Sequence, residues 1–109
     1  MKIYVCASFR FAGEVEKIEA FLFERGFEVL TSKVPDPRGM RSCLEKIARA
    51  DVVYGFLPDQ VGRSVAFDLG YAVALGKPVY VSHPVKDPPI GDFVAGIVSA
   101  EQLAGSMGF

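Results

Sequence analysis

One helical segment carries an acidic residue on its apolar face. The small or apolar residues of that face recur at intervals of three and four positions: Val65, Leu69, Ala72 and Gly76. Asp68 falls on the same stripe and interrupts it with a carboxylate. Because burial of an unpartnered carboxylate is costly, we expect Asp68 to meet hydrogen-bond donors or to line a cleft.

Two interpretations of Asp68 follow from this position. A partly buried carboxylate near a helix start could attack the anomeric carbon of a sugar as a nucleophile, or act as a general base. Alternatively, Asp68 complements the helix dipole and accepts hydrogen bonds from nearby backbone. Periodicity alone does not separate these interpretations.

Polar residues gather in the turn before this helix and at its start: Asp59, Gln60, Arg63 and Ser64. Their side chains could bind a sugar hydroxyl, a base or a phosphate. Turns commonly collect the same residue types for structural reasons, so both interpretations stay open.

A second group of candidates lies in the loop ASFRFAG, which follows the first apolar run. Ser8 and Arg10 precede a helix whose free backbone N–H groups attract anions, and Arg10 could add a bidentate contact to phosphate or carboxylate. The alternative is that Ser8 satisfies a turn and Arg10 is solvated. Neither a Walker A sequence nor a GxGxxG motif occurs, which argues against an ATPase and a standard dinucleotide site.

His83 is the single histidine of the chain and follows an expected strand. There it could bind phosphate or transfer a proton. Without an evident catalytic triad, an ordinary loop histidine is an equally good interpretation.

Apolar runs alternate with helical periods along the chain. Strands are expected over residues 2–6, 27–31, 52–57, 79–82 and 93–98. Helices are expected over residues 14–25, 40–50, 63–76 and 100–105, the last capped by Ser99. Proline-rich loops are expected over residues 32–39, as a lid, and over residues 83–92.

This alternation predicts the α/β class. We expect a single doubly wound parallel sheet of about five strands in a three-layer αβα arrangement, with a flavodoxin-like (Rossmann-like) strand order. Ligands of such sheets bind beyond the carboxyl ends of the strands. The loops after Cys6, Leu57 and Ser82 are therefore expected to carry the function.

Composition limits the classes of function. The chain has 109 residues, half of them hydrophobic, and a formal net charge of -1, which fits one domain spanning residues 1–109 and argues against a nucleic-acid polymer as partner. No signal peptide or membrane span is expected, so a cytoplasmic location is the default. Cys6 and Cys43 lack CxxC spacing, so we expect reduced, buried thiols without a disulfide or metal site.

Three stretches together resemble the nucleoside 2-deoxyribosyltransferase superfamily, which includes deoxynucleoside monophosphate N-hydrolases: IYVCASFRFAG, LEKIARADVVYGFL and VGRSVAFDLGYAVALGKPVYV. In that family a glutamate attacks the anomeric carbon of a 2-deoxyribose and releases the base. Asp68 occupies this position. By the same resemblance, Ser8 and Arg10 border the 5′ end of the nucleotide, Ser64 contacts phosphate or sugar, and the chain forms a homodimer.

The sequence departs from the family pattern at four positions. Asp68 is one methylene shorter than glutamate, and Cys43 aligns with the family's sugar-orienting aspartate. Gly62 replaces a polar residue, and Ala7 replaces a glycine of the first loop. These changes leave open whether the chain reacts with a nucleotide or only binds it.

Three hypotheses result. The first is an enzyme that cleaves or exchanges the N-glycosidic bond of a 2-deoxynucleoside or its 5′-monophosphate, without metal or cofactor. Its catalytic residue is Asp68, and its binding residues are Ser8, Arg10, Asp59, Gly62, Arg63, Ser64 and His83. The second is an inactive nucleotide-binding or sensor module of the same fold. The third, a flavodoxin-like flavoprotein or a protein without ligand, is disfavoured for flavin because tryptophan and a Ser/Thr-rich phosphate loop are lacking.

Overall fold

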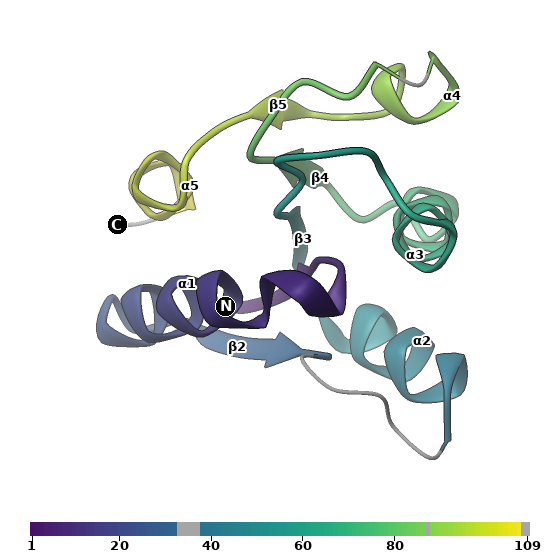
Figure 1. The fold of residues 1–109 in the computed structure, drawn as a ribbon. Coiled ribbons are helices and arrows are strands. Elements are labelled where there is room, and N and C mark those ends of the chain that lie inside the picture. Colours follow the sequence, from purple (N-terminus) through teal and green to yellow (C-terminus); the bar gives the residue numbers. More distant parts are fainter. Residues whose placement is uncertain (33–37, 87, 108–109) are drawn as a thin grey trace.

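Strands and helices alternate along the chain as the periodicity predicts (Figure 1). The computed structural model describes residues 1–32, 38–86 and 88–107. Its strands are β1 (Lys2–Cys6), β2 (Glu28–Thr31), β3 (Val52–Gly55), β4 (Val79–Val81) and β5 (Gly96–Ile97). Its helices are the 3-10 turn η1 (Phe9–Phe11), α1 (Ala12–Glu24), α2 (Met40–Arg49), α3 (Arg63–Ala74), α4 (Pro88–Gly91) and α5 (Ala100–Met107).

All neighbouring strands of the sheet are parallel, and their order is β2-β1-β3-β4-β5. Helices α1 and α5 cover one face of this sheet, and α2, α3 and α4 lie on the other (Figure 1). The expected doubly wound, three-layer fold with a flavodoxin-like strand order is therefore confirmed. Its topological switch point lies between β1 and β3, where such folds bind ligands.

The structure differs from the expected elements at three places. The first helical segment begins earlier, with η1 followed directly by α1. The loop expected over residues 83–92 contains the short helix α4, because proline is tolerated in the first turn of a helix. Strand β5 has only two residues. Most of the expected lid, residues 33–37, lies outside the described residues.

The cap expected for the last helix is confirmed in detail. The Ser99 hydroxyl accepts a hydrogen bond from the backbone N–H of Gln102 at 3.1 Å, and the Gln102 side chain accepts one from the backbone N–H of Ser99 at 2.8 Å. This reciprocal pair satisfies two N–H groups at the helix start. It anchors the start of α5, the helix that packs beside α1.

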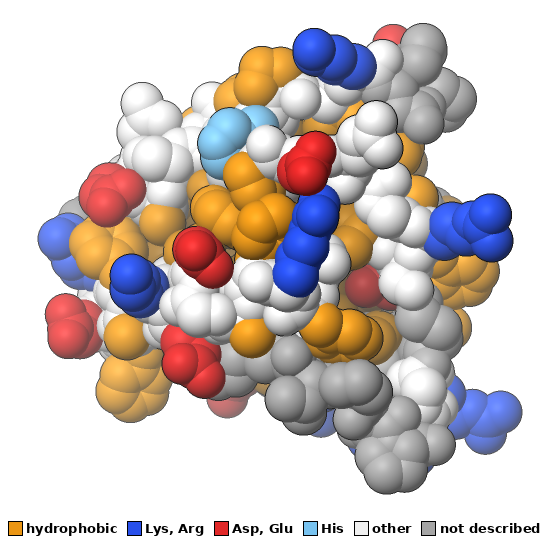
Figure 2. Space-filling model, viewed as in Figure 1, with side chains coloured by type: hydrophobic (Ala, Val, Ile, Leu, Met, Phe, Trp, Pro, Cys, Tyr) orange, Lys and Arg blue, Asp and Glu red, His pale blue; other side chains and the backbone are white. Residues whose placement is uncertain are grey.

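Charged side chains of both signs are interspersed on the face of the molecule shown in Figure 2. Lysine and arginine do not gather there into one basic stripe of the kind that tracks a nucleic-acid backbone. Within residues 1–32, 38–86 and 88–107, no helix is long and apolar enough to cross a membrane.

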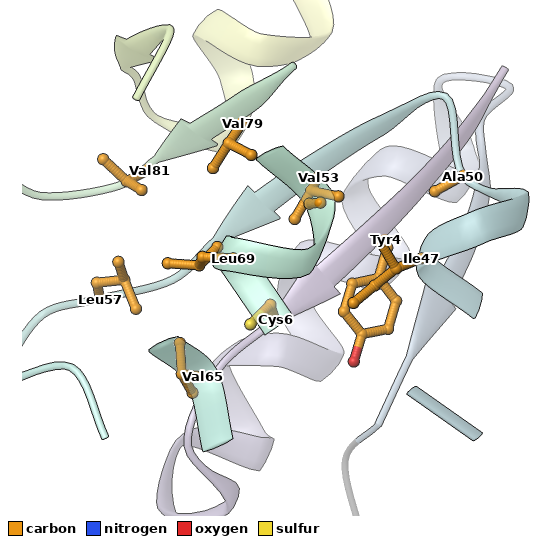
Figure 3. Packing of buried hydrophobic residues seen from close by; sticks show 11 residues of the cluster. Tyr4, Cys6, Ile47, Ala50, Val53, Leu57, Val65, Leu69, Val79 and Val81 are labelled. Atoms are coloured by element: carbon orange, nitrogen blue, oxygen red, sulfur yellow. The ribbon is translucent and has the colours of Figure 1, made fainter. Parts of the chain in front are cut away.

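Strand β1 is buried on both of its faces. Ile3 and Val5 face the core beneath α1 and α5, whereas Tyr4 and Cys6 face the core beneath α2 and α3. Successive side chains of a strand point to opposite faces, which explains this division. Figure 3 shows Tyr4 and Cys6 among the apolar side chains of that second core. The polar ends of both side chains therefore lie under α3, the helix that carries Asp68.

Candidate functional site

A cavity of about 510 Å³ opens beside the carboxyl ends of β1 and β2. Residues from the loop after β1, from α2 and from the first two turns of α3 form its walls. Its polar lining side chains are Tyr4, Ser8, Ser32, Cys43, Arg63, Ser64 and Asp68. Ala7 and Gly62 line it as well. The volume falls within the range of sites that hold small molecules.

Asp68 lies in the second turn of α3, with 6 % of its surface exposed. Its Oδ2 accepts hydrogen bonds from the Tyr4 hydroxyl at 3.3 Å and the Cys6 thiol at 3.7 Å. Its Oδ1 is buried and has no hydrogen-bond partner among the described residues. Both partners are side chains of β1, whereas the structural interpretation required backbone donors near the helix. Asp68 thus lines the cavity with one oxygen held by hydrogen bonds and with one buried oxygen that has no partner among the described residues.

Burial raises the pKa of Asp68 from its ordinary value of 3.8 to about 6, and the hydrogen bonds from Tyr4 and Cys6 oppose this rise. The ionised form of Asp68 therefore predominates at neutral pH. Burial, and next the nearby Asp68, raises the pKa of the Cys6 thiol, and burial likewise raises the pKa of Tyr4. Both side chains remain protonated donors while Asp68 is an anion.

The first turn of α3 forms a positively polarised site, opposite in sign to the carboxylate of Asp68. Gly62 is its N-cap and provides no side-chain cap, and the backbone N–H groups of the first turn have no acceptors within the helix. Arg63 and Ser64 line the same cavity, and their side chains make no hydrogen bond within the described chain. A helix N-terminus beside an arginine and a hydroxyl is a favourable site for an anion.

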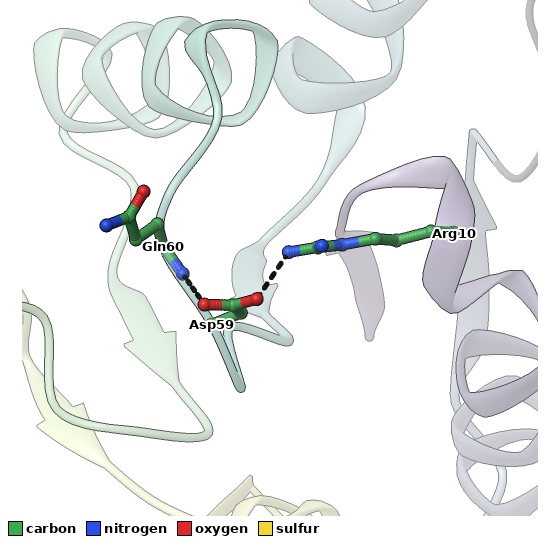
Figure 4. A network of polar contacts seen from close by, with 3 residues as sticks. All are labelled: Arg10, Asp59 and Gln60. Atoms are coloured by element: carbon green, nitrogen blue, oxygen red, sulfur yellow. Dashed lines mark hydrogen bonds and ion pairs between the residues drawn. The ribbon is translucent and has the colours of Figure 1, made fainter.

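Two other candidates form an ion pair with each other outside the cavity lining. Nη2 of Arg10 lies 2.9 Å from Oδ2 of Asp59, whose Oδ1 accepts the backbone N–H of Gln60 at 2.8 Å (Figure 4). The Gln60 N–H, and next the Arg10 charge, lower the pKa of Asp59. The Arg10 guanidinium also lies 4.8 Å from the centre of the Phe11 ring. Any ligand contact by Arg10 competes with these partners.

His83 belongs to the same surface. Its Nδ1 lies 2.6 Å from Oγ of Ser82, and that oxygen accepts the backbone N–H of Leu57 at 2.8 Å. The rings of His83 and Phe56 pack in an edge-to-face arrangement, as do the rings of Phe56 and Phe11. The structure thus brings Ser8, Gly62, Arg63, Ser64 and Asp68 together around the cavity. It places Arg10, Asp59 and His83 in a separate aromatic and charged group.

Three residues that line the cavity or contact Asp68 are not singled out as site residues by the sequence patterns. Tyr4 and Cys6 alternate along β1 and so share the sheet face beneath α3, and the period of two along this strand is the signal that could have found them. Ser32 follows β2 and accepts a hydrogen bond from the Cys43 thiol at 3.3 Å. Only the fold brings Ser32 near Asp68, so no local pattern announces it.

Among the residues that the model describes, no group of three or more His, Cys, Asp or Glu side chains lies close enough together to hold a metal ion. The described lining of the cavity contains one carboxylate, from Asp68, and one half-buried thiol, from Cys43.

Comparison with protein-family models and with curated proteins yields no match. Among solved structures, the chain is similar to a CMP N-glycosidase, BcmB, from Clostridium botulinum. The likeness covers 98 % of both chains, with a TM-score of 0.68 and 15 % sequence identity. At this identity the comparison establishes a shared fold.

Proposed function

We propose that this protein cleaves the N-glycosidic bond of a nucleoside 5′-monophosphate, with Asp68 as the nucleophile. The observation that carries this proposal is the state of Asp68, a residue that lines a cavity of about 510 Å³: Oδ2 is held by Tyr4 and Cys6, and the buried Oδ1 has no partner among the described residues. The shared fold with a CMP N-glycosidase supports the reaction class.

The proposed reaction is a double displacement. Oδ1 of Asp68 forms a bond to C1′ of the sugar while the C1′–N bond breaks, and the base leaves with the electron pair and takes a proton from solvent. Water then attacks C1′ of the glycosyl ester, releasing the sugar phosphate and restoring the carboxylate. Attack by a second base in place of water would give base exchange. Two inversions at C1′ retain its configuration.

The substrate phosphate is assigned to the start of α3. Arg63, Ser64 and the free N–H groups after Gly62 line the cavity that also contains Asp68. An anion there is stabilised by the helix dipole and by the guanidinium. This assignment favours monophosphates over nucleosides.

The test measures the release of free base, which is detected by chromatography. The panel contains nucleosides and their 5′-monophosphates, each in the ribose and the 2-deoxyribose form. The proposal expects base from at least one monophosphate, together with an equal amount of sugar phosphate. Absence of base from the whole panel would contradict it.

The second candidate is a nucleotide-binding module without turnover. The substitutions at Asp68 and Cys43, relative to the family that the sequence resembles, favour it. This candidate predicts that a nucleotide raises the melting temperature while no base is released. Nucleotide binding together with the release of base would instead support the enzyme.

Activity is expected to fall at acid pH because the nucleophile must be ionised. With the pKa of Asp68 at about 6, kcat/KM should be nearly constant above pH 7 and should fall about tenfold per pH unit well below pH 6. The measurement is kcat/KM for the best monophosphate between pH 4.5 and 8.5. A profile that is flat through pH 5 would argue against a carboxylate with a raised pKa.

Arg63→Ala is expected to lower kcat/KM for a monophosphate by about 10- to 100-fold, because a charge-assisted hydrogen bond contributes about 1.5–3 kcal/mol. The rate with the matching nucleoside should change little. Arg49→Ala is the matched control, since Arg49 is exposed at the far end of α2. Equal losses with nucleoside and monophosphate would place the phosphate elsewhere.

A further inference from the structure

A chain of hydroxyl and thiol groups runs along the cavity wall to Asp68. The Cys43 thiol donates to Oγ of Ser32 at 3.3 Å. This Oγ lies 3.3 Å from the Tyr4 hydroxyl oxygen, which lies 3.3 Å from Oδ2 of Asp68. The four groups come from α2, the residue after β2, β1 and α3. Residues far apart in the sequence thus form one connected path.

Counting hydrogens fixes the direction of this path. The Tyr4 hydroxyl has one hydrogen but two neighbours, Ser32 and Asp68, so it donates to only one of them. An ionised carboxylate accepts only, and hydrogen bonds to it are about twice as strong as neutral ones. Tyr4 therefore donates to Asp68, which leaves its oxygen as an acceptor for the Ser32 hydroxyl. The Cys43 thiol donates to Ser32, so all three hydrogens point toward the carboxylate.

We propose that Ser32 and Cys43 are positioning residues that act on Asp68 through Tyr4. Each donor polarises the next, so the chain strengthens the final hydrogen bond to Oδ2. The relay keeps Oδ2 occupied and leaves Oδ1 without a partner among the described residues. That Oδ1 then attacks the sugar rests on the proposed function, whereas the hydrogen-bond relay is a property of the protein alone and is measured without turnover.

Other groups near Asp68 do not replace this relay. In the part of the chain that the structure describes, the titratable side chains that contact Asp68 or line its cavity are Tyr4 and Cys6 from β1, Cys43 from α2 and Arg63 from α3. Cys6 contacts Oδ2 directly at 3.7 Å and is not bonded to Ser32. Arg63 does not form a hydrogen bond with Asp68 within the described residues. Ser32 thus reaches the carboxylate through Tyr4.

The experiment titrates the carboxyl carbon of Asp68 by ¹³C NMR in the full chain labelled at aspartate. The Asp68 signal is identified by its loss in Asp68→Asn. Ser32→Ala should raise the pKa of Asp68 by about 0.3–0.6, since one cooperative donor is lost. Tyr4→Phe should raise it by about 1 or more, because the direct donor is lost. Ser32→Thr keeps the hydroxyl and should restore the wild-type titration.

Ser8→Ala is the matched control, because Ser8 lines the same cavity outside the relay. It should leave the titration of Asp68 unchanged. An unchanged pKa in Ser32→Ala would overturn the proposal. A lowered pKa would overturn it too, because it would mean that Ser32 draws the Tyr4 hydrogen away from Asp68. If base release is also absent from the wild type, the proposed function fails while the titration still decides on the relay.

Discussion

Asp68→Asn is expected to lower the rate of base release by roughly 10³-fold or more, because an amide cannot form the glycosyl ester. Nucleotide binding should persist, since Arg63 and Ser64 at the start of α3 are untouched. The measurement pairs single-turnover base release with a nucleotide titration by calorimetry. Asp59→Asn serves as the matched control, because it removes a carboxylate outside the cavity lining.

Two outcomes would separate the alternatives for this variant. Loss of release with retained binding agrees with nucleophilic catalysis by Asp68. Release at the wild-type rate would remove Asp68 from the reaction and leave the carboxylate with a structural role.

The same variant is expected to be more stable than the wild type at neutral pH. The folded state raises the pKa of Asp68 to about 6, so it favours the neutral form, and ionisation between pH 4 and pH 6 lowers the free energy of unfolding of the wild type. Asparagine is neutral throughout. We expect the free energy of unfolding of Asp68→Asn, minus that of the wild type, to increase by about 1–3 kcal/mol from pH 4 to pH 8.

Denaturant unfolding at several pH values measures this difference. Asp59→Asn should change stability in the opposite direction, because Gln60 and Arg10 lower the pKa of Asp59. The contribution of Asp59 is present above its unfolded pKa and is lost as the pH falls. If Asp68→Asn were less stable than wild type at pH 8, ionised Asp68 would be a stabilising group, contrary to its burial with an unpartnered oxygen.

The sheet could be predicted because its signals are local. The apolar run at β3 and the helical period around Val65 and Leu69 each lie within a dozen residues, and right-handed crossovers leave few ways to connect them. The same helical period marks Asp68 as the acidic interruption of an apolar face. Short or proline-rich elements are harder to predict, because β5 and α4 each offer too few residues for a clear period.

The surroundings of Asp68 could not be predicted in the same way. Tyr4 looks like an ordinary core residue in sequence, and only its distance from Asp68 shows that its hydroxyl is used. The ion pair between Arg10 and Asp59 joins η1 to the loop after β3 across 49 residues of sequence, which no spacing rule captures. Candidates at one edge of the sheet need not belong to one site: His83 contacts Ser82 and Phe56 and is not among the residues that line the cavity. Long-range contacts decide which polar residues form a site.

The most direct test of nucleophilic catalysis is to trap the bond between Asp68 and the sugar. A 2-deoxy-2-fluoro nucleoside 5′-monophosphate slows the second displacement, so the glycosyl ester should accumulate and be seen by mass spectrometry of the intact protein. We predict a gain of one fluorinated sugar phosphate per chain, mapped to the peptide containing Asp68 and absent from Asp68→Asn. Base release without any adduct on Asp68, or an adduct on another residue, would contradict the proposed role of this carboxylate.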